Sequence, residues 1–349
     1  MKKKPANVPL ESKRKKLNLA LQGGGAHGAF TWGVLDRLLE EDRIVIEGIV
    51  GTSAGAVNAA ILAYGLESGG PQKARELLKN FWIYNSENSQ CSPFQPTLCD
   101  KAFGSKGSME FSPSWQMFDM FSRMLSPYQW NPNNMNVFRD VIEKTIDFSV
   151  LQQSKSIKLF ICATNVLTGR LKVFENKEIT PDMILASACL PYLYQAPEIN
   201  GQYYWDGGYM GNPPIFPVIY NTDCQDVLIV QINPINIPEV PRSAPAILDR
   251  INTLSFNSSL MREMRAIWFV TSLVEKGELD AEKHKHTFIH TVDAEEEMAR
   301  LTASSKMNLD RSFLQYLFDT GRVKAAEFLE NHYDKIGKES STDIKAKFF

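Results

Sequence analysis

The chain has 349 residues, of which 44% are hydrophobic and 22% are charged. These proportions are close to those of soluble globular proteins, and they exclude a collagen-like, coiled-coil or largely disordered chain. The net charge of -2 argues against a general nucleic-acid binder, because neutralising phosphates requires a strong excess of Lys and Arg.

The cysteines predict neither a zinc site nor a disulfide framework. None has the paired CxxC spacing, and their odd number would leave one over; they are Cys91, Cys99, Cys162, Cys189 and Cys224. A reducing compartment is therefore expected, and no metal or organic cofactor is implied.

The first 16 residues carry seven Lys and Arg against Glu11 alone, with no apolar run between them. They lack the pattern of a secretory signal peptide, so we expect a solvated, flexible tail over residues 1–16. The alternative is a basic arm that contacts anionic lipid headgroups, since each Lys or Arg near such a surface contributes about 1 kcal/mol.

The uncharged stretch 48–66 is broken by a Gly-rich turn, so it predicts a buried strand and helix and not a membrane span. With neither a signal peptide nor a membrane span expected, we predict a cytoplasmic protein or one peripherally associated with a membrane. Export by a route that needs no N-terminal signal stays open.

Two strand–turn–helix units open the folded part of the chain. Residues 17–21 predict a buried strand, which is followed by a glycine loop at 23–28 and an amphipathic helix. The pattern repeats with a strand at 44–50, a tight turn at 51–55 and a small-residue helix at 56–64. Two such units in a row predict an α/β fold in which helices cover a mainly parallel sheet, with ligands at the carboxyl ends of the strands.

Residues 81–138 are unusually aromatic: twelve of these 58 residues are Phe, Trp or Tyr, and only seven are charged. Their rings and the side chains of Met109, Met117, Met120 and Met124 must pack on something apolar. Two interpretations overlap. The segment is an ordinary helical insertion that closes the core, or a cap that lines an acyl-chain pocket or meets a bilayer.

The remaining elements are predicted from shorter patterns. Further strands are expected at 157–163, 171–174, 202–205, 227–232 and 287–291, a long helix at 246–275, and a pair of helices around Gly321 within 310–332.

The sequence Gly51-x-Ser53-x-Gly55 between a strand and a helix is typical of a nucleophile elbow. Small residues are needed on both sides of the serine because the chain turns sharply, which pushes Oγ of Ser53 clear of the sheet and places it at a helix N-terminus. There the helix dipole and the free amides favour developing negative charge. We predict that Ser53 is a catalytic nucleophile.

The glycine loop suggests a partner for that serine. Gly23, Gly24 and Gly25 can turn their N–H groups toward one point, as a tetrahedral oxyanion requires. The alternative is dinucleotide binding, because the glycines up to Gly28 match GxGxxG and Glu47 lies near the position of a ribose-binding acid. The second strand ends in a serine where that acid would sit, so we favour the oxyanion hole.

A base for the serine is harder to find. No histidine has an evident orienting acid: His27 lies inside the glycine loop, and the others are His284, His286, His290 and His332. A carboxylate is the alternative, and Asp206 follows a predicted strand and precedes two glycines that allow close backbone approach. Taken alone, Asp-Gly-Gly is more often a simple turn.

In this order, the glycine loop, GTSAG about 25 residues later and a distal DGG resemble the patatin-like phospholipase family. The similarity extends through Ala186-Ser187-Ala188-Cys189-Leu190-Pro191 and Asn212-Pro213-Pro214, and it covers roughly residues 17–230. The resemblance implies a three-layer α/β/α fold and a Ser/Asp dyad.

By that resemblance Ser53 would be the nucleophile, Asp206 the general base and the amides of Gly23, Gly24 and Gly25 the oxyanion hole. Gly28, Gly51 and Gly55 would complete the turns around the substrate. We expect a structural role for His27, which stands where many members carry Arg.

The expected function is therefore that of a serine esterase in lipid degradation, a lipid acyl hydrolase of the phospholipase A or lysophospholipase type. Its expected partner is a lipid substrate at a membrane or micelle surface, with no nucleic acid. Thioesterase or polyester-depolymerase activity on the same dyad stays open, as does a non-catalytic lipid-binding effector module. We expect residues 17–300 to form the catalytic domain, with 81–138 as a cap-like insertion, and 301–349 to form a helical extension packed on it.

Overall fold

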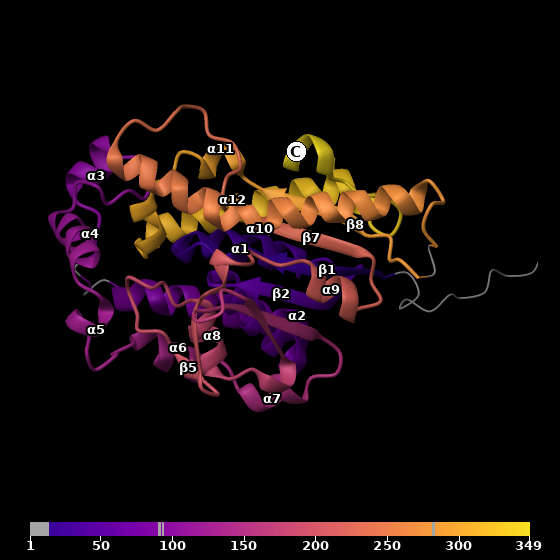
Figure 1. Ribbon diagram of the computed structural model, residues 1–349, viewed down its shortest axis with the longest axis horizontal. Coiled ribbons are helices and arrows are strands. Elements are labelled where there is room, and N and C mark those ends of the chain that lie inside the picture. Colours follow the sequence, from indigo (N-terminus) through magenta and orange to yellow (C-terminus); the bar gives the residue numbers. More distant parts are fainter. Residues whose placement is uncertain (1–13, 90–91, 93, 281–282) are drawn as a thin grey trace, which may run out of the picture.

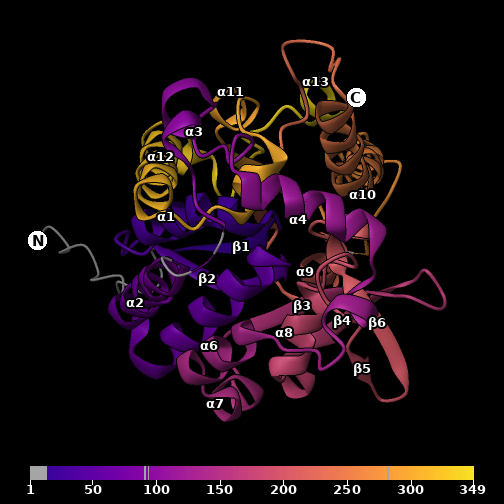
Figure 2. The same ribbon diagram turned by 90° about the vertical axis from the view of Figure 1, so that its left-hand side faces the viewer.

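A mixed sheet lies between two layers of helices in the computed structural model, which describes residues 14–89, 92, 94–280 and 283–349 (Figures 1 and 2). The strands are β1 (Lys15–Leu21), β2 (Ile44–Thr52), β3 (Lys158–Asn165), β4 (Leu171–Glu175), β5 (Glu198–Ile199), β6 (Gln202–Asp206), β7 (Asp226–Gln231) and β8 (Phe288–Asp293). The helices are α1 (Gly28–Leu38), α2 (Ala54–Ser89), α3 (Leu98–Phe103), α4 (Pro113–Met124), α5 (Pro127–Trp130), α6 (Val137–Thr145), α7 (Phe148–Gln153), α8 (Pro181–Ser187), α9 (Phe216–Asn221), α10 (Ala244–Glu275), α11 (Glu295–Met298), α12 (Arg311–His332) and α13 (Ile344–Phe348).

The sheet is mainly parallel, as predicted. Strands β3, β2, β1, β7 and β8 pair in that order and run parallel, whereas β4, β5 and β6 run antiparallel to their neighbours. Every predicted strand is present, with ends shifted by two residues or fewer. Because β1 begins at Lys15, the predicted tail overlaps it by two residues; Arg14 is exposed, and residues 1–13, like Cys91, lie outside the described residues.

The alternating side chains of β1 show how the sheet separates two cores. Leu17, Leu19 and Leu21 lie in the larger core with α1, α2 and α12. Ala20 points to the other face, where α9, α10 and α13 cover a smaller core. The sheet is therefore the middle of three layers. None of the helices in the described ranges is both long and apolar enough to span a membrane.

The register of β3 places the end of β2 beside the end of β6. Thr52, the last residue of β2, is opposite Cys162, and the next residue of β3, Ala163, is opposite Asp206 of β6. Since β4 occupies the other edge of β3 over the same residues, β6 takes the place of β2 in the ladder where β2 turns into α2. The fold thus brings Asp206 to the residue that follows Thr52.

Helix α2 is longer than the predicted small-residue helix and reaches into the aromatic segment. It is broken at Gly69 and Gly70, and Phe81 and Trp82 of its second half are buried in the larger core. Phe138 packs beside Phe81 with 6.1 Å between ring centroids. Phe81 and Trp82 therefore belong to the core and Phe138 packs against it, while α3, α4 and α5 lie at one end of the molecule in Figure 1 and leave apolar side chains exposed; Met109, between α3 and α4, is fully buried.

The predicted pair of helices around Gly321 is wrong, because α12 is one continuous helix. A Cβ atom at Gly321 would lie 2.1 Å from the carbonyl oxygen of Phe30, and one at Gly33 of α1 would lie 2.0 Å from that of Phe318. Gly321 is therefore not a helix breaker. It lets α12 approach the backbone of α1.

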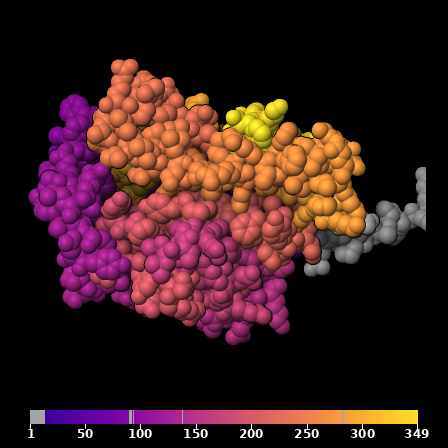
Figure 3. Space-filling view, in the orientation of Figure 1, coloured from indigo at the N-terminus to yellow at the C-terminus, as the bar shows by residue number. Residues whose placement is uncertain are grey.

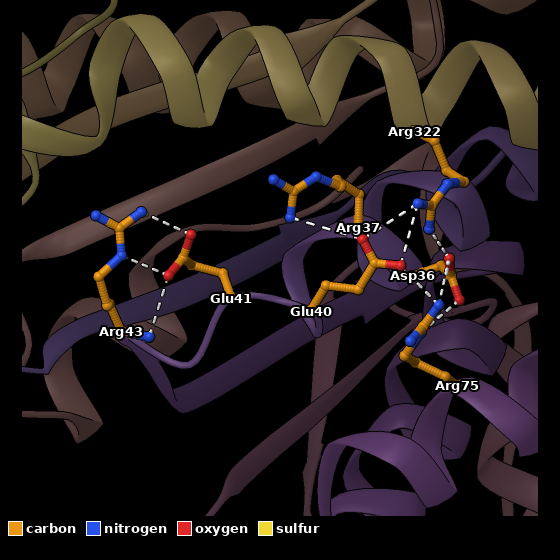
Figure 4. A network of polar contacts seen from close by, with 7 residues as sticks. All are labelled: Asp36, Arg37, Glu40, Glu41, Arg43, Arg75 and Arg322. Atoms are coloured by element: carbon orange, nitrogen blue, oxygen red, sulfur yellow. Dashed lines mark hydrogen bonds and ion pairs between the residues drawn. The ribbon is translucent and has the colours of Figure 1, made fainter.

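A charged network holds the same helices together (Figure 4). Asp36 of α1 accepts a hydrogen bond from Nε of Arg75 of α2 at 2.8 Å and also pairs with Arg322 of α12. Glu40, one turn later, accepts from both arginines, at 2.8 Å and 3.1 Å. Two carboxylates, one on α1 and one just after its end, thus fix α2 and α12 in place, although their partly exposed position limits the stabilisation from each pair.

We expect Gly321→Ala to destabilise the protein by roughly 1 to 3 kcal/mol, because the added methyl group overlaps the Phe30 carbonyl and forces α12 away from α1. Urea denaturation followed by circular dichroism measures the change. Asp319→Ala, at an exposed position of the same helix, is the control and should change stability little. A Gly321→Ala protein as stable as the wild type would contradict the close packing of the two helices.

Candidate active site

Ser53 occupies a strained turn between β2 and α2. Its φ is 55°, a left-handed conformation that non-glycine residues rarely adopt and that occurs where surrounding structure enforces it. A Cβ at Gly51 would lie 2.4 Å from the carbonyl oxygen of Gly55, and one at Gly55 would lie 2.1 Å from that of Leu21. The glycines of the predicted elbow are therefore required by the packing, as the sequence pattern indicated.

The backbone of Ser53 is held by Ser187, at the end of α8. The hydroxyl of Ser187 accepts a hydrogen bond from the Ser53 N–H at 2.9 Å and donates one to the carbonyl of Cys162 at 2.6 Å. Ser187 is fully buried. One hydroxyl thus ties the strained turn to β3, a role that the sequence motif around Ser187 did not reveal.

Asp206 ends β6 beside this turn and is fully buried. Its Oδ1 accepts a hydrogen bond from the N–H of Gly208 at 2.7 Å, while Oδ2 has no hydrogen-bond partner among the described residues. Burial raises the pKa of Asp206 to about 7, against the opposing influence of the nearby Ser53 hydroxyl and the Gly208 amide. The structure therefore brings together the two side chains predicted as a dyad, and leaves one carboxylate oxygen unoccupied.

The glycine loop lies against the serine. A Cβ at Gly23 would be 2.6 Å from Cβ of Ser53, so only glycine fits there. The Gly23 amide is not available to a ligand, because it donates to Oδ1 of Asn212 at 2.6 Å. The amides of Gly24 and Gly25 donate no hydrogen bond to any part of the chain that the structure describes. Of the three predicted oxyanion donors, two remain free.

Buried side-chain amides form a hydrogen-bonded cluster that holds the glycine loop. Asn233 donates to the carbonyl of Gly23 at 2.7 Å, and Gln22 accepts from the backbone amides of Ile232 and Asn233, both at 2.9 Å. Asn212 and Asn257 complete the cluster through Gln22. The sequence offered no signal for this set, whose members are far apart in the chain.

Gly28 and Glu47 occupy positions that bear on the alternative of dinucleotide binding. A Cβ at Gly28 would lie 2.9 Å from that of Ala54, so this glycine allows the first turns of α1 and α2 to meet. Glu47 lies in the first half of β2, where it pairs with Lys16 and accepts from the amide of Asp223. It is engaged away from the carboxyl ends of the strands, where a ribose would bind.

His27 is enclosed by the C-terminal part of the chain. It is 3% exposed, its Nε2 lies 2.7 Å from Oγ of Ser305, and its ring contacts Phe313. Burial, with a contribution from Lys306, lowers the pKa of His27 to about 3, so the imidazole is neutral at pH 7. These contacts are those of a structural residue.

His290 does have an orienting acid, contrary to the sequence analysis. Its Nε2 lies 3.0 Å from Oδ1 of Asp226, and its Nδ1 lies 2.9 Å from Oγ of Ser341. This buried group lies at the amino end of β7, the opposite end of the sheet from Ser53, where it fastens the C-terminal segment to β8. In the described ranges, no three His, Cys, Asp or Glu side chains gather as metal ligands would.

A cavity of about 860 Å³ lies next to the glycine loop. It is bounded by α4, by the segment from Ile237 through the first turns of α10, and by residues 298–306, and Figure 3 shows it as a hollow between the purple and orange atoms. His27 and Ile232 contribute to its wall, whereas Ser53 and Asp206 do not. The cavity therefore approaches the dyad from the side of the loop.

A strand–turn–helix serine beside a buried carboxylate, on a mainly parallel three-layer sheet, defines an α/β protein with a hydrolase-like site. The sequence profile of the family described as "Patatin-like phospholipase" matches residues 19–219, more than half of the chain. The chain therefore belongs to the patatin-like phospholipase family, whose members are typically serine hydrolases, and membership implies lipid acyl hydrolase activity.

Solved structures with a similar fold come from two bacteria. VipD from Legionella pneumophila is 14% identical with a TM-score of 0.44, and the match covers 97% of this chain and 73% of that one. ExoU from Pseudomonas aeruginosa, in the ExoU–SpcU complex of the type III secretion system, is 14% identical with a TM-score of 0.39; the match covers 93% of this chain and 52% of that one. No curated protein sequence matches the chain.

The raised pKa of Asp206 predicts a pH-dependent stability. The ordinary carboxyl value is 3.8 and the folded value about 7, so the folded protein holds this proton more tightly and loses stability as the pH rises from about 4 to 7. The variant Asp206→Asn has no carboxyl to ionise, so it avoids this loss of stability. Its side-chain amide can donate an N–H to Ser53. We expect its Tm to exceed that of the wild type by roughly 2 to 4 °C or more at pH 8.

At pH 4, where the wild-type carboxyl is also protonated in the folded protein, the difference in Tm should shrink. Differential scanning calorimetry at both pH values measures it. An equal or lower Tm for the variant at pH 8 would contradict a destabilising buried charge at this position.

Proposed function

We propose that the protein hydrolyses fatty-acyl esters of phospholipids or lysophospholipids, with Ser53 as nucleophile and Asp206 as general base. The observation that carries this proposal is the buried carboxyl of Asp206 beside a serine held in a strained turn at the start of a helix, with Oδ2 of Asp206 lacking a hydrogen-bond partner among the described residues.

In the proposed reaction, Oγ of Ser53 attacks the acyl carbonyl carbon while its proton passes to Asp206. The carbonyl oxygen becomes an oxyanion next to the free amides of Gly24 and Gly25, and its collapse expels the alcohol, which takes the proton from Asp206. Water then attacks the acyl-enzyme while Asp206 accepts its proton, and collapse of the second oxyanion releases the fatty acid as Asp206 returns the proton to Oγ of Ser53. Amides that are already positioned supply much of the rate, because losing one such donor typically costs ~10²- to 10³-fold.

The buried position of Asp206 suits it to this work. A carboxylate with an ordinary pKa is a weak base, whereas one whose pKa is raised to about 7 accepts a proton more readily and is still ionised in half of the molecules at neutral pH. The cost of burying the charge thus improves the proposed base.

We expect Ser53→Ala and Asp206→Asn each to reduce acyl-ester hydrolysis by at least ~10³-fold and to abolish labelling by a fluorophosphonate probe. The wild-type kcat/KM should rise with pH through about 7, as Asp206 loses its proton. Ser86→Ala, which removes another buried hydroxyl from α2, is the control and should keep both activity and labelling. Turnover by a folded Ser53→Ala protein would end the proposal.

A lipid surface is the proposed partner, and the apolar face of α4 suits it. Met117, Met120, Phe121 and Met124 recur at helical spacing along α4 and are between 46% and 72% exposed. The helix buries none of its side chains, and its one cation, Arg123, is paired with Asp119. A weakly charged apolar stripe of this kind can lie in the interface of a zwitterionic leaflet.

We expect Phe121→Asp to lower hydrolysis of phosphatidylcholine vesicles about tenfold or more, because burying a Phe side chain in lipid contributes roughly 1.5 to 3 kcal/mol. Hydrolysis of a soluble short-chain ester should not change. Val323→Asp, at an exposed apolar position of α12, is the matched control. An equal loss on both substrates would show that the α4 face does not act through the lipid surface.

A further inference from the structure

The cavity beside the glycine loop is lined by unusually many charges of both signs. Its cations are Arg123, Arg242, Arg250, Arg300 and Lys306, and its acids are Glu110, Asp119, Glu239 and Asp249. Apart from Arg123 and Asp119, none of these side chains forms an ion pair with another charged side chain in the described ranges. Opposite charges that share a cavity without pairing leave both signs available to a ligand.

Lys306 lines the cavity, and its backbone packs against the proposed oxyanion loop. Its backbone carbonyl packs on Gly25, where a Cβ would lie only 2.3 Å from that oxygen. Its side chain has no hydrogen bond or ion pair within the described residues. Its charge interacts electrostatically with the ring of His27 and the carboxyl of Asp249. An unpaired cation in such a position favours an anion in the cavity.

Arg250, on the first turns of α10, supplies a second donor. Its Nη2 donates to the carbonyl of Ile235 at 2.8 Å, which fixes the guanidinium. Its Nη1 is buried and has no hydrogen-bond partner in the part of the chain that the structure describes. A buried N–H group without a partner costs stability, so a ligand oxygen at this atom would offset that cost.

Two acids and an aromatic ring share the lining of this cavity: Asp249, Glu110 and Trp115. Neither acid forms an ion pair within the described residues. Burial raises the pKa of each, Asp249 raises that of Glu110 further, and Lys306 and Arg250 oppose the rise at Asp249. Trp115 lines the same wall and is held by ring contacts with Phe94 and Phe118. Carboxylates beside an indole face are the groups that bind an alkylammonium ion in proteins.

We propose that this cavity binds the zwitterionic headgroup of a phospholipid, with its phosphate at Lys306 and Arg250 and its ammonium group at Asp249, Glu110 and Trp115. The inference rests on the proposed acyl hydrolysis, because it names the class of lipid whose ester reaches Ser53. A volume of about 860 Å³ is within the usual range for small-molecule sites, so it can hold a headgroup with room for water.

The spacing of the loop is compatible with a glycerophospholipid. The Cβ position of Gly23 lies against Ser53 and that of Gly25 against the backbone of Lys306, and two residues of backbone span at most about 7 Å. That length is comparable to the few covalent bonds that separate an acyl carbonyl from the phosphorus atom across the glycerol. A phospholipid whose ester lies at Ser53 can therefore place its phosphate on the side of the loop that Lys306 covers.

Binding of soluble phosphocholine tests the site without any turnover. The protein is the full chain with Ser53→Ala, titrated in a calorimeter with phosphocholine, inorganic phosphate and choline. We expect phosphocholine to bind about tenfold or more tightly than either fragment, since each charged hydrogen bond contributes roughly tenfold or more. In Lys306→Met, phosphocholine should bind no better than choline, and in Asp249→Asn no better than phosphate.

Two further variants keep the result interpretable. Lys79→Met, on an exposed position of α2 away from the cavity, is the control and should bind like the parent protein. Arg250→Met removes the other phosphate donor and should also lower phosphocholine affinity, even where Lys306→Met disturbs the packing on Gly25. Unchanged phosphocholine binding in both Lys306→Met and Arg250→Met would overturn the proposal. So would a parent protein that binds phosphocholine no better than its fragments.

Hydrolysis of intact phospholipids is the second test of the headgroup site. In mixed micelles with the same acyl chains, the wild-type kcat/KM should be about tenfold higher for phosphatidylcholine than for phosphatidylglycerol, and Asp249→Asn should remove this difference. Equal rates on both lipids, with intact short-ester hydrolysis, would defeat the headgroup site alone. Phosphocholine binding in a protein that hydrolyses no ester would instead defeat the proposed function alone.

Discussion

The turn at the end of β2 is the constraint on which the arrangement around Ser53 depends. The chain reverses direction within a few residues, holds Ser53 at a φ of 55°, and brings the backbones of Gly51, Gly55 and Leu21 so close that a methyl group on either glycine would overlap a carbonyl oxygen. Such a conformation persists only where the surroundings enforce it. Here three neighbours hold the turn. They are the hydroxyl of Ser187, strand β6, which replaces β2 in the ladder, and the glycine loop.

The groups around Ser53 also explain why the neighbouring carboxyl is costly. Asp206 ends β6 in the interior of the protein, where the Gly208 amide and the nearby Ser53 hydroxyl stabilise its charge, and its Oδ2 has no hydrogen-bond partner among the described residues. Further hydrogen bonds would normally offset the desolvation cost of such a buried charge, and Asp206 forms few of them. Enzymes commonly place such unsatisfied groups where the substrate or the reaction makes use of them.

The sequence was informative where a local conformation demands one residue type. Sharp turns require glycines at Gly51 and Gly55, and the strands alternate or run apolar, so the sheet, the elbow and the position of Asp206 after a strand could be predicted. The amides of Asn212 and Asn233 could not, because their partner is a loop some 200 residues away and Asn in isolation is typical of a turn. Gly321 misled for a related reason: its glycine serves a contact with α1 that no local pattern encodes. The acid of His290 was missed because Asp226 lies on another strand.

The packing of residues 303–306 over the glycine loop has a consequence for how the protein is made. Gly25 and His27 leave the ribosome about 280 residues before Lys306 and Ser305, which cover them. Domains generally fold from the N-terminus during synthesis. The nascent chain must therefore carry an unfinished glycine loop while these residues are made, and a chain stopped before this segment would have its elbow serine but not the cover over its loop.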